Sequence, residues 1–538
     1  MNEYINKFRN LLPLLNHCEG PGTMEDGIIR HLLDILDLKS NYFVEFGQRT
    51  LGRGTLGRIA REKEGGLLVI DSRAIKEEKI YPWNNSTEWT SRRCLVTPFN
   101  INNIFDECCV PEMPSACVID VDGMDYWCML AILQKRRPSL LICEYNCHID
   151  LDIEATLAYN ENHTYSHGKD YGASLLALKQ LAERHSYRLV HIHGPLNAYF
   201  VAEELVDWNG FNETLSFERI KEQGISSISS TEMFYDSFHT GERPSWYGRK
   251  DPEPEKPPWF RLDQIGEEVE IVRIDELMIA VYARDTGGSH YKLRSHKEES
   301  VSPIWRLIRH SLKPNVLIDI GANYGHTAAM LSSRLAVQRI YAVEPDPRLA
   351  ELIRDNLRQV GDRCDIRLIQ AAISSCNEPV TLLGINPHST QDNRVVKPKN
   401  WQEVVAPVIS LDKIIAEVPL SSSMFIKSDT QGFDINVIRS GYRELTSRKK
   451  WMLRCEFAPD WIKSQGFDTV MELEWLCSSF RVFEAPLRTT WNARLNEVLN
   501  KTIEASQAYS FTEYVRSLNH NGKGWVDLYV LPDDCTCW

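Results

Sequence analysis

Two acidic residues stand at or just after neighbouring apolar runs, where their carboxylates could bind a polar ligand. Asp319 ends such a run before a loop that contains Gly321 and Gly325, and Glu344 follows the next run. Glycines let a ligand approach the backbone closely because they lack a Cβ atom. In doubly wound sheets, an acid at the tip of the second strand binds the paired hydroxyls of a ribose. The interval of 344 − 319 = 25 residues is close to the roughly 20 expected.

The loop itself favours one nucleoside cofactor over another. It reads Asp-x-Gly-x-x-x-Gly from Asp319 to Gly325, with fewer glycines than a pyrophosphate-binding loop and a carboxylate that would repel phosphate. Such a carboxylate can instead hold an ammonium group or a water near a sulfonium ligand. The pattern therefore favours S-adenosylmethionine over NAD. A tight turn without any ligand is the alternative at this point.

The elements that position these residues are those of an α/β protein. The runs 316–320 and 339–343 predict two strands, and residues 327–331 predict the start of the helix between them. A strand, a tight loop and a helix form the first unit of a doubly wound, mostly parallel sheet. Ligands bind such sheets at the carboxyl ends of the strands, where Asp319 and Glu344 lie.

Further motifs occur in one order over roughly residues 265–538. They are Asp319-x-Gly-Ala-Asn-x-Gly, Tyr341-Ala-Val-Glu-Pro345, Ala371-Ala372-Ile373-Ser374, Ser410-Leu411-Asp412, Phe425-Ile-Lys-Ser-Asp-Thr-Gln-Gly-Phe-Asp434 and Cys455-Glu456-Phe457. This part of the chain resembles the FkbM-type methyltransferases. The resemblance implies an S-adenosylmethionine-dependent enzyme, in a family that largely methylates hydroxyl oxygens of sugars and secondary metabolites.

The fold and the resemblance together predict the cofactor-binding residues. Asp319 is expected at the methionine end of the cofactor, Glu344 at the ribose, and two consecutive alanines at the adenine. The full predicted set is Asp319, Gly321, Ala322, Asn323, Gly325, Glu344, Ala371 and Ala372.

Four residues are candidates for the chemical step. Methyl transfer is an in-line displacement, and a hydroxyl nucleophile must also lose its proton. Asp429 has the best position for the base and Glu456 the second best, while Lys427 can hold a carboxylate in place. His326 is the fourth candidate, with the alternative that it only begins a helix. A nearby acid, Asp434, is explained equally well as a helix N-terminal residue favoured by the helix dipole.

The first half of the chain repeats the pattern of the second. Glu45 and Asp71 each end an apolar run, 71 − 45 = 26 residues apart. Later blocks align in order, so that Asp120, Gly123, Asp125 and Glu144 fall on Asp429, Gly432, Asp434 and Glu456. Ordered self-similarity indicates a duplicated domain. The predicted fold is therefore two tandem Rossmann-like doubly wound sheets, at residues 1–240 and 263–538, joined by a linker at 241–262 that is rich in proline and charge.

The first copy departs from the pattern in its loop. Residues 48–55 lack the second copy's Gly-Ala-Asn-x-Gly and carry Arg49 and Arg53, which are unfavourable beside a sulfonium. We expect this copy to have lost cofactor binding and to serve in substrate docking or dimerisation. A second active methyltransferase is the alternative.

Composition restricts the partners. The net charge of −13 and pI near 5.7 argue against a nucleic-acid backbone as the main partner, and no apolar stretch is long enough for a membrane span. The 14 cysteines are scattered and predict reduced thiols in the cytoplasm. His148, His163 and His167 do not have the spacing of a standard ligand set, so we expect no metal.

The sequence thus predicts a cytoplasmic O-methyltransferase that acts on a glycan or a hydroxylated small molecule, with a possible homodimer through its N-terminal domain. Two alternatives remain. One is N-methylation of a small molecule, which needs no strong base. The other is a non-catalytic binding or assembly protein built from two methyltransferase-like folds.

Overall fold

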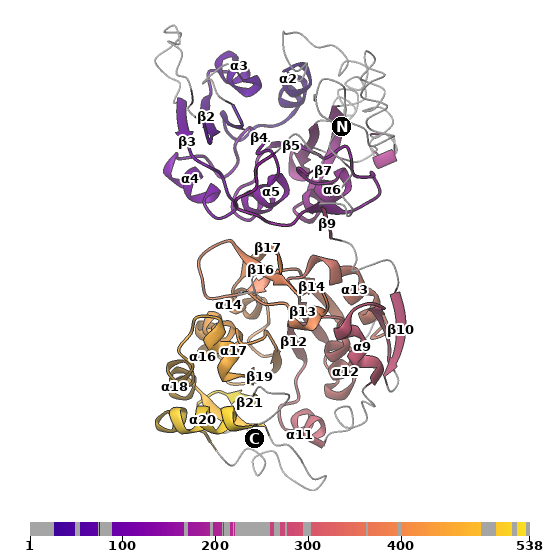
Figure 1. The fold of residues 1–538 in the computed structure, drawn as a ribbon, viewed down its shortest axis with the longest axis vertical. Coiled ribbons are helices and arrows are strands. Elements are labelled where there is room, and N and C mark those ends of the chain that lie inside the picture. Colours follow the sequence, from indigo (N-terminus) through magenta and orange to yellow (C-terminus); the bar gives the residue numbers. More distant parts are fainter. Residues whose placement is uncertain are drawn as a thin grey trace. The chain divides into compact units, whose positions relative to one another are not determined.

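The computed structural model contains two compact units, Met1–Leu262 and Asp263–Trp538 (Figure 1). The structure describes residues 26–48, 54–73, 75, 89–165, 170–193, 197–206, 208, 216–218, 220, 259–262, 269–274, 277–293, 303–361, 364–395, 401–485, 502–518 and 524–533. Arg49, Arg53, His167 and residues 241–258 of the predicted linker lie outside the described residues.

The C-terminal unit is built on a seven-stranded sheet in the order β14-β13-β12-β18-β19-β21-β20. The first five strands of that order run parallel, whereas β21 is antiparallel to both of its neighbours. The strands are β12 (Val316–Ile320), β13 (Arg339–Val343), β14 (Asp365–Ile369), β18 (Met424–Ser428), β19 (Trp451–Phe457), β20 (Arg481–Glu484) and β21 (Val526–Leu531).

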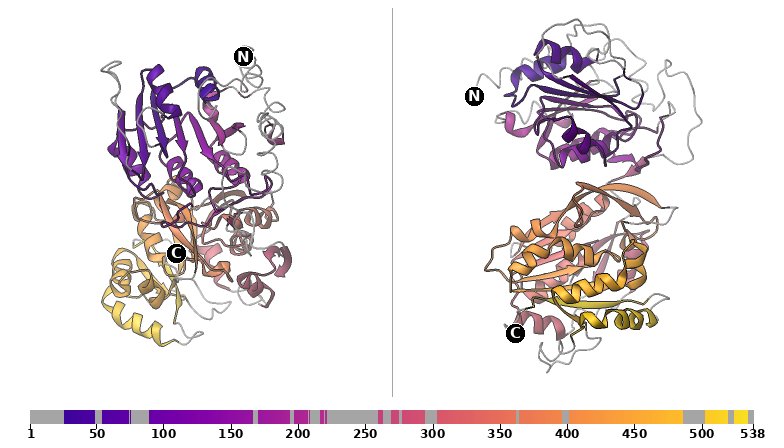
Figure 2. Two further views of the ribbon diagram at one scale, coloured as in Figure 1. Left: turned by 45° about the horizontal axis from the view of Figure 1, so that its top comes forward. Right: turned by 90° about the vertical axis from the view of Figure 1, so that its left-hand side faces the viewer.

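Helices cover both faces of this sheet (Figure 2). Successive strand residues point to opposite faces, so Leu317 and Ile318 belong to two different buried clusters. The first cluster receives side chains of α11 (Pro303–Ser311), α12 (His326–Leu335) and α13 (Ala350–Arg358). The second receives those of α14 (Leu411–Ala416), α15 (Asp434–Ser440), α16 (Tyr442–Ser447), α17 (Pro459–Ser464), α18 (Thr469–Ser479) and α20 (Ala508–Ser517).

Two smaller sheets flank the main sheet of this unit. One is a hairpin of β10 (Val269–Ile274) and β11 (Leu277–Tyr282), which α9 (Thr286–Leu293) follows. The second sheet contains β15 (Ala372–Ile373), β16 (Val380–Ile385) and β17 (Gln402–Ile409). The connection from β16 to β17 includes the short helix η4 (Thr390–Asp392), and a further short helix, η3 (Pro347–Leu349), follows β13. A third, η5 (Ala505–Gln507), precedes α20.

The N-terminal unit has the same topology, as the duplication predicts. Its sheet runs β3-β2-β1-β4-β5-β8-β7, again with only the strand equivalent to β21, which is β8, antiparallel to both neighbours. The strands are β1 (Tyr42–Phe46), β2 (Gly66–Asp71), β3 (Trp89–Arg93), β4 (Ala116–Ile119), β5 (Leu140–Glu144), β7 (Tyr187–His193) and β8 (Asn197–Ala202). The helices are α2 (Asp26–Ile35), α3 (Thr55–Glu62), α4 (Ile101–Glu107), α5 (Asp125–Leu133), α6 (Leu175–Arg184) and η1 (Glu203–Leu205).

Local backbone geometry supports the same alignment of the two copies. Asp122 and Gln431 both have a φ of 55°, and each precedes a glycine of positive φ, Gly123 or Gly432.

One difference from the prediction concerns the linker. Its end, β9 (Trp259–Arg261), pairs with β6 (Ala155–Leu157) and so belongs to the first unit.

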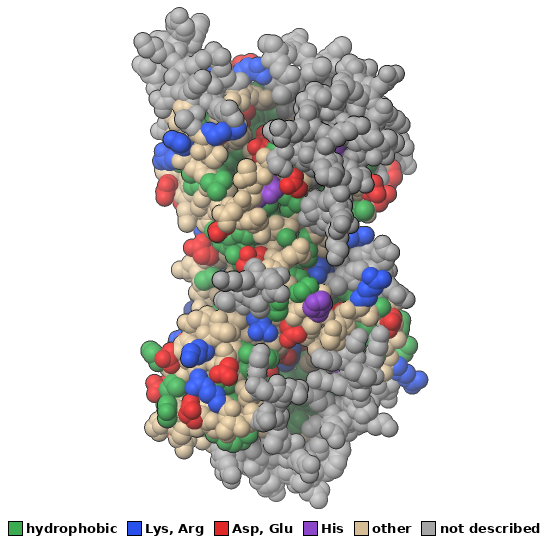
Figure 3. Space-filling model, in the orientation of Figure 1, with side chains coloured by type: hydrophobic (Ala, Val, Ile, Leu, Met, Phe, Trp, Pro, Cys, Tyr) green, Lys and Arg blue, Asp and Glu red, His purple; other side chains and the backbone are tan. Residues whose placement is uncertain are grey.

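Two surface properties bear on partners. Among the described residues, the structure contains no helix with the length and apolar character needed to cross a bilayer. On the face drawn in Figure 3, the described lysine and arginine side chains are interspersed with aspartate and glutamate.

The turn after β12 should tolerate no side chain at Gly321. Its φ is +74°, and a Cβ there would lie 2.1 Å from the backbone oxygen of Asp429. Gly361 is a matched control, since its φ is +73° but no atom lies within 4 Å of its Cβ position. We expect Gly361→Ala to cost about 1 kcal/mol of stability for the left-handed backbone alone, and Gly321→Ala at least about 3 kcal/mol. Equal shifts in the unfolding midpoints of the two variants would contradict this account.

Candidate active site

The loop after β12 forms one wall of a cavity at the carboxyl ends of the central strands. The chain leaves β12 through Gly321, Asn323 and Gly325, whose φ values of 74°, 50° and 76° are all left-handed, and α12 then begins at His326. The cavity has a volume of about 340 Å³. Of the predicted site residues, it is lined by Gly321, Ala322, Asn323, His326, Glu344, Ala371, Ala372, Lys427, Asp429 and Glu456.

Glu344 lies directly after β13 and is buried. Its Oε2 accepts a hydrogen bond from the backbone N–H of Asn323 at 2.8 Å, and its Oε1 accepts one from that of Asp346 at 3.0 Å. Burial raises the pKa of Glu344 to about 7, although both backbone donors favour the ionised form. Each oxygen has one protein donor, which leaves acceptor capacity for a ligand with two neighbouring hydroxyls.

Asp319 does not line the cavity; it lies in β12, the strand that leads into the glycine loop. It is fully buried in β12, and Lys427 Nζ lies 3.4 Å from its Oδ1 and 3.6 Å from Oδ2 of Asp429. The same ammonium donates to the backbone oxygen of Gly321 at 3.1 Å. Burial raises the pKa of Asp319, while Lys427 opposes that shift. Lys427 therefore joins the glycine loop to the strand end that carries Asp429.

The two candidate bases have different surroundings. Asp429 is about half exposed, with 45% of its side chain accessible, and it accepts a hydrogen bond from Gln431. Glu456 has a buried Oε2 with no hydrogen-bond partner among the described residues. Burial, with the charges of Asp429, Asp434 and Asp527, raises the pKa of Glu456 well above its ordinary value.

Asp434 and His326 both occupy helix starts. Asp434 is the first residue of α15 and accepts hydrogen bonds from the Ser428 hydroxyl at 2.6 Å and the Thr430 N–H at 3.2 Å, so it organises the loop after β18. His326 is the first residue of α12, and its ring centre lies 5.1 Å from that of Tyr291. His326 also lines the cavity, so its position fits both roles considered for it.

A polar segment between β16 and β17, residues 386–394, lies along the cavity. We call it the strap. Thr390, Gln391, Asn393 and Arg394 of the strap line the cavity. The Arg394 guanidinium lies 5.5 Å from the centre of the Trp401 ring and 5.4 Å from that of Trp461.

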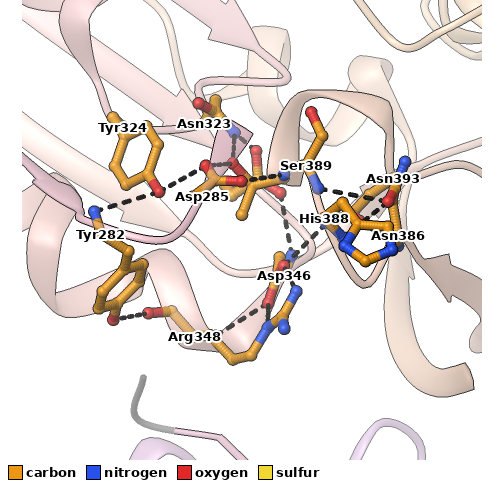
Figure 4. Close-up of polar contacts among 12 residues, drawn as sticks. Tyr282, Asp285, Asn323, Tyr324, Asp346, Arg348, Asn386, His388, Ser389 and Asn393 are labelled. Carbon is orange, nitrogen blue, oxygen red and sulfur yellow. Dashed lines mark hydrogen bonds and ion pairs between the residues drawn. The ribbon is translucent and has the colours of Figure 1, made fainter. Parts of the chain in front are cut away.

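Two residues that hold the strap were not among the sequence candidates. Asp346 accepts hydrogen bonds from Asn393 at 2.8 Å and from Arg348 at 2.9 and 2.6 Å. Asp285, which precedes α9, accepts two hydrogen bonds from Thr390 (Figure 4). The Asp-x-Arg spacing that begins two residues after Glu344 was a local sequence signal for the Asp346–Arg348 pair. The link from Asp285 to Thr390 spans 105 residues and had no sequence signal.

The N-terminal unit has a cavity of about 600 Å³ at the equivalent strand ends, but its acids are engaged differently. Asp71, in the position of Glu344, accepts three hydrogen bonds from Arg73, at 2.7, 2.9 and 2.9 Å. Glu45, in the position of Asp319, is turned toward the start of α3 and accepts from the Leu56 N–H at 3.4 Å. Burial raises the pKa of Glu45 to about 7. Glu45 and Asp71 therefore have different hydrogen-bond and ion-pair partners from Asp319 and Glu344.

One group of acids in the N-terminal unit could hold a metal ion by distance alone. Carboxylate oxygens of Asp120, Asp122 and Glu144 lie within 4.8 Å of one another. His148 and His163 belong to no such group among the described residues. Clusters of exposed acids are common without a metal, so the expectation of no metal stays a prediction.

Comparison with known proteins finds a family model that matches part of the C-terminal unit. Residues 319–482 match the model of the methyltransferase FkbM domain. A 2-O-methyltransferase NoeI of Sinorhizobium fredii (strain NBRC 101917 / NGR234) is 29% identical over 153 residues, which cover 26% of this chain and 62% of the relative. The chain thus spans less than two thirds of that relative's length.

Solved methyltransferase structures are also similar. Precorrin-6y C5,15-methyltransferase from Geobacter metallireducens GS-15 has 15% identity and a TM-score of 0.23, covering 44% of this chain and 92% of that chain. Haemonchus contortus phosphoethanolamine N-methyltransferase 2, solved with S-adenosyl-L-methionine, has 8% identity and a TM-score of 0.25, covering 95% and 100%. These TM-scores are too low to assign a fold, so the fold is assigned from the sheet order described above.

Removal of the Lys427 charge should destabilise the C-terminal unit because Asp319 would be left buried without its counter-ion. We expect Lys427→Met to cost about 3 kcal/mol or more. The loss should be larger at pH 8 than at pH 5. The unfolded chain ionises Asp319 at both pH values, whereas the folded variant must bind a proton at Asp319 or bury its charge, and binding that proton costs more free energy as the pH rises. In an Asp319→Asn background, the same substitution should cost much less. Chemical denaturation at both pH values checks this, and an equal loss in both backgrounds would contradict it.

Proposed function

We propose that this protein, whose C-terminal unit carries a methyltransferase domain of the FkbM type, is an S-adenosylmethionine-dependent O-methyltransferase acting on a glycan or a hydroxylated small molecule. One observation carries the proposal. A single cavity is lined by the glycine loop, by the buried acid Glu344 and by the partly buried acid Glu456, whose buried Oε2 has no hydrogen-bond partner among the described residues. The first two fit a nucleoside, and Glu456 fits an acceptor that must lose a proton.

The residues present fit S-adenosylmethionine. Gly321 lines the cavity without a side chain, so a ligand can lie close to the backbone there. Glu344 offers two oxygens to the ribose hydroxyls, and Asn323 has a buried carbonyl oxygen with no partner among the described residues. Ala371 and Ala372 provide a small, apolar wall for the adenine.

Within the cavity, we assign the proton acceptor to Glu456. The cofactor supplies a methyl group on a positively charged sulfur. When the acceptor oxygen bonds to the methyl carbon, the carbon–sulfur bond breaks and its electron pair stays with the sulfur. The proton of the acceptor hydroxyl must then go to a base. A base of raised pKa holds a proton better near neutral pH, and burial gives Glu456 such a pKa. Asp429, which is half exposed and paired with Lys427, orients the neighbouring groups.

The proposal also specifies the class of acceptor and the location of the protein. Support for a hydroxyl acceptor comes from the relative's description as a 2-O-methyltransferase and from Glu456, since N-methylation needs no such base. The net charge of −13 supports a small-molecule or glycan substrate over nucleic acid. We place the protein in the cytoplasm because its cysteines are scattered.

For the N-terminal unit, we propose a role in substrate docking or homodimerisation without cofactor binding. The support is the state of its two strand-end acids. Arg73 occupies the Asp71 oxygens that would otherwise receive a ribose, and Glu45 faces the start of α3.

Titration calorimetry with S-adenosylmethionine tests the cofactor assignment. We expect one site per chain, with affinity that falls as the pH is lowered through about 7, because protonation of Glu344 removes an acceptor from the ribose hydroxyls. Glu344→Gln should bind at least about tenfold more weakly, at the loss expected for a hydrogen bond to a charged group, and with little pH dependence. Two sites would contradict the role given to the N-terminal unit, and no binding would reject the enzyme.

Transfer of a labelled methyl group to hydroxylated acceptors tests the base. We expect Glu456→Gln to lower kcat by about 10²–10⁴-fold while cofactor affinity changes little. The activity of the native protein should rise with pH as Glu456 ionises. Asp429→Asn is the matched comparison and should lose less. A Glu456→Gln variant with near-native kcat would favour N-methylation or a different base.

A further inference from the structure

A buried carboxylate outside the predicted site is joined to the glycine loop through the strap. Asp285 is only 2% exposed. Its Oδ2 accepts hydrogen bonds from the Tyr324 hydroxyl at 2.7 Å and the Gly288 N–H at 2.9 Å, and its Oδ1 accepts one from the Thr390 N–H at 2.9 Å. These contacts hold the start of α9, the glycine loop and the strap around one side chain (Figure 4).

The Thr390 hydroxyl connects Asp285 to Asn323. Its oxygen lies 2.7 Å from Oδ2 of Asp285 and 2.9 Å from Nδ2 of Asn323. A hydroxyl has one hydrogen to donate, and a carboxylate can only accept. The hydrogen of Thr390 therefore points to Asp285, because a hydrogen bond to a charged acceptor is the stronger one. Only the lone pairs of Thr390 remain for Asn323, so the atom of Asn323 that faces Thr390 must be the amide nitrogen.

This arrangement fixes which end of the Asn323 amide is available to a ligand. Asn323 lines the cavity, and its buried Oδ1 has no hydrogen-bond partner among the described residues. The backbone cannot easily turn away, because its N–H is bonded to Glu344 at 2.8 Å. The free atom is thus a pure acceptor beside the proposed cofactor.

We propose that Asp285 is a positioning residue for the cofactor, which acts through Thr390 to present the carbonyl oxygen of Asn323 to a hydrogen-bond donor of S-adenosylmethionine. This inference rests on the proposed function. The cofactor has three kinds of hydrogen-bond donor, the ammonium of its methionine part, the hydroxyls of its ribose and the amino group of its adenine. Because the adenine is assigned to Ala371 and Ala372, the first two are the donors considered for Asn323. Without the carboxylate, the Thr390 hydrogen can turn toward Asn323, whose amide then rotates and presents N–H groups to that donor.

Cofactor binding to the full-length Asp285→Asn variant tests the relay. Calorimetry should show affinity for S-adenosylmethionine reduced about tenfold or more, which is the effect expected for a lost hydrogen bond to a charged or strongly polar partner. Thr390→Val, which removes the relay hydroxyl, should behave in the same way. Thr390→Ser, which keeps that hydroxyl, should retain native affinity.

A double-mutant cycle separates the relay from a general loss of structure. Asn323→Gly removes the amide and suits the left-handed φ of 50°. If Asp285 acts through Asn323, adding Asp285→Asn to Asn323→Gly should weaken binding no further. Equal fold-losses in both backgrounds would overturn the proposal, as would native affinity in Asp285→Asn.

A truncated ligand identifies the donor. Methylthioadenosine has the ribose but lacks the ammonium, so a loss confined to S-adenosylmethionine assigns the ammonium, and a loss with both ligands that vanishes in the Asn323→Gly background assigns the ribose. If the native protein binds neither ligand, the proposed function itself fails. That result differs from native binding that is unaffected by Asp285→Asn.

Discussion

The cavity of the C-terminal unit depends on a close approach between the turn after β12 and the turn after β18. The two strands are parallel neighbours, so their carboxyl ends meet at the same edge of the sheet. Gly321 passes so near the Asp429 backbone oxygen that a Cβ would lie 2.1 Å from it. The N-terminal unit repeats the constraint at Gly47, where a Cβ would lie 2.8 Å from the oxygen of Asp120. Both copies therefore need glycine there, whether or not they bind a cofactor.

The two units share this frame but differ in how they use their acids. An Asp-x-Arg pair occurs after the second strand in both. In the C-terminal unit it is Asp346 with Arg348, two residues beyond Glu344, so Glu344 keeps acceptor capacity for a ligand. In the N-terminal unit the pair begins at the strand end itself, as Asp71 with Arg73. A shift of two residues thus separates an acid with free acceptor capacity from one whose oxygens are both bonded to arginine.

Much of this structure was predictable because its signals are local. The apolar runs at β12 and β13, the glycine loop and the repeat of motifs lie within short stretches, and the structure confirms the strands and the tandem fold. The Asp285–Thr390 link was not predictable, because residues 105 positions apart meet only through the packing of a hairpin and a strap. The sequence also could not show that Oε2 of Glu456 has no hydrogen-bond partner among the described residues, because that depends on the three-dimensional surroundings of the side chain.

The strap forms one wall of the cavity in the C-terminal unit. Thr390 is tied to the glycine loop through Asn323, while Arg394, held between two tryptophan rings, lies on the same cavity as Glu456. Only three residues separate Thr390 from Arg394, so contacts that fix the position of one also limit the positions open to the other. The strap therefore links the Asn323 side of the cavity to the Glu456 side, and a change in its position on one side would alter the shape of the cavity on the other.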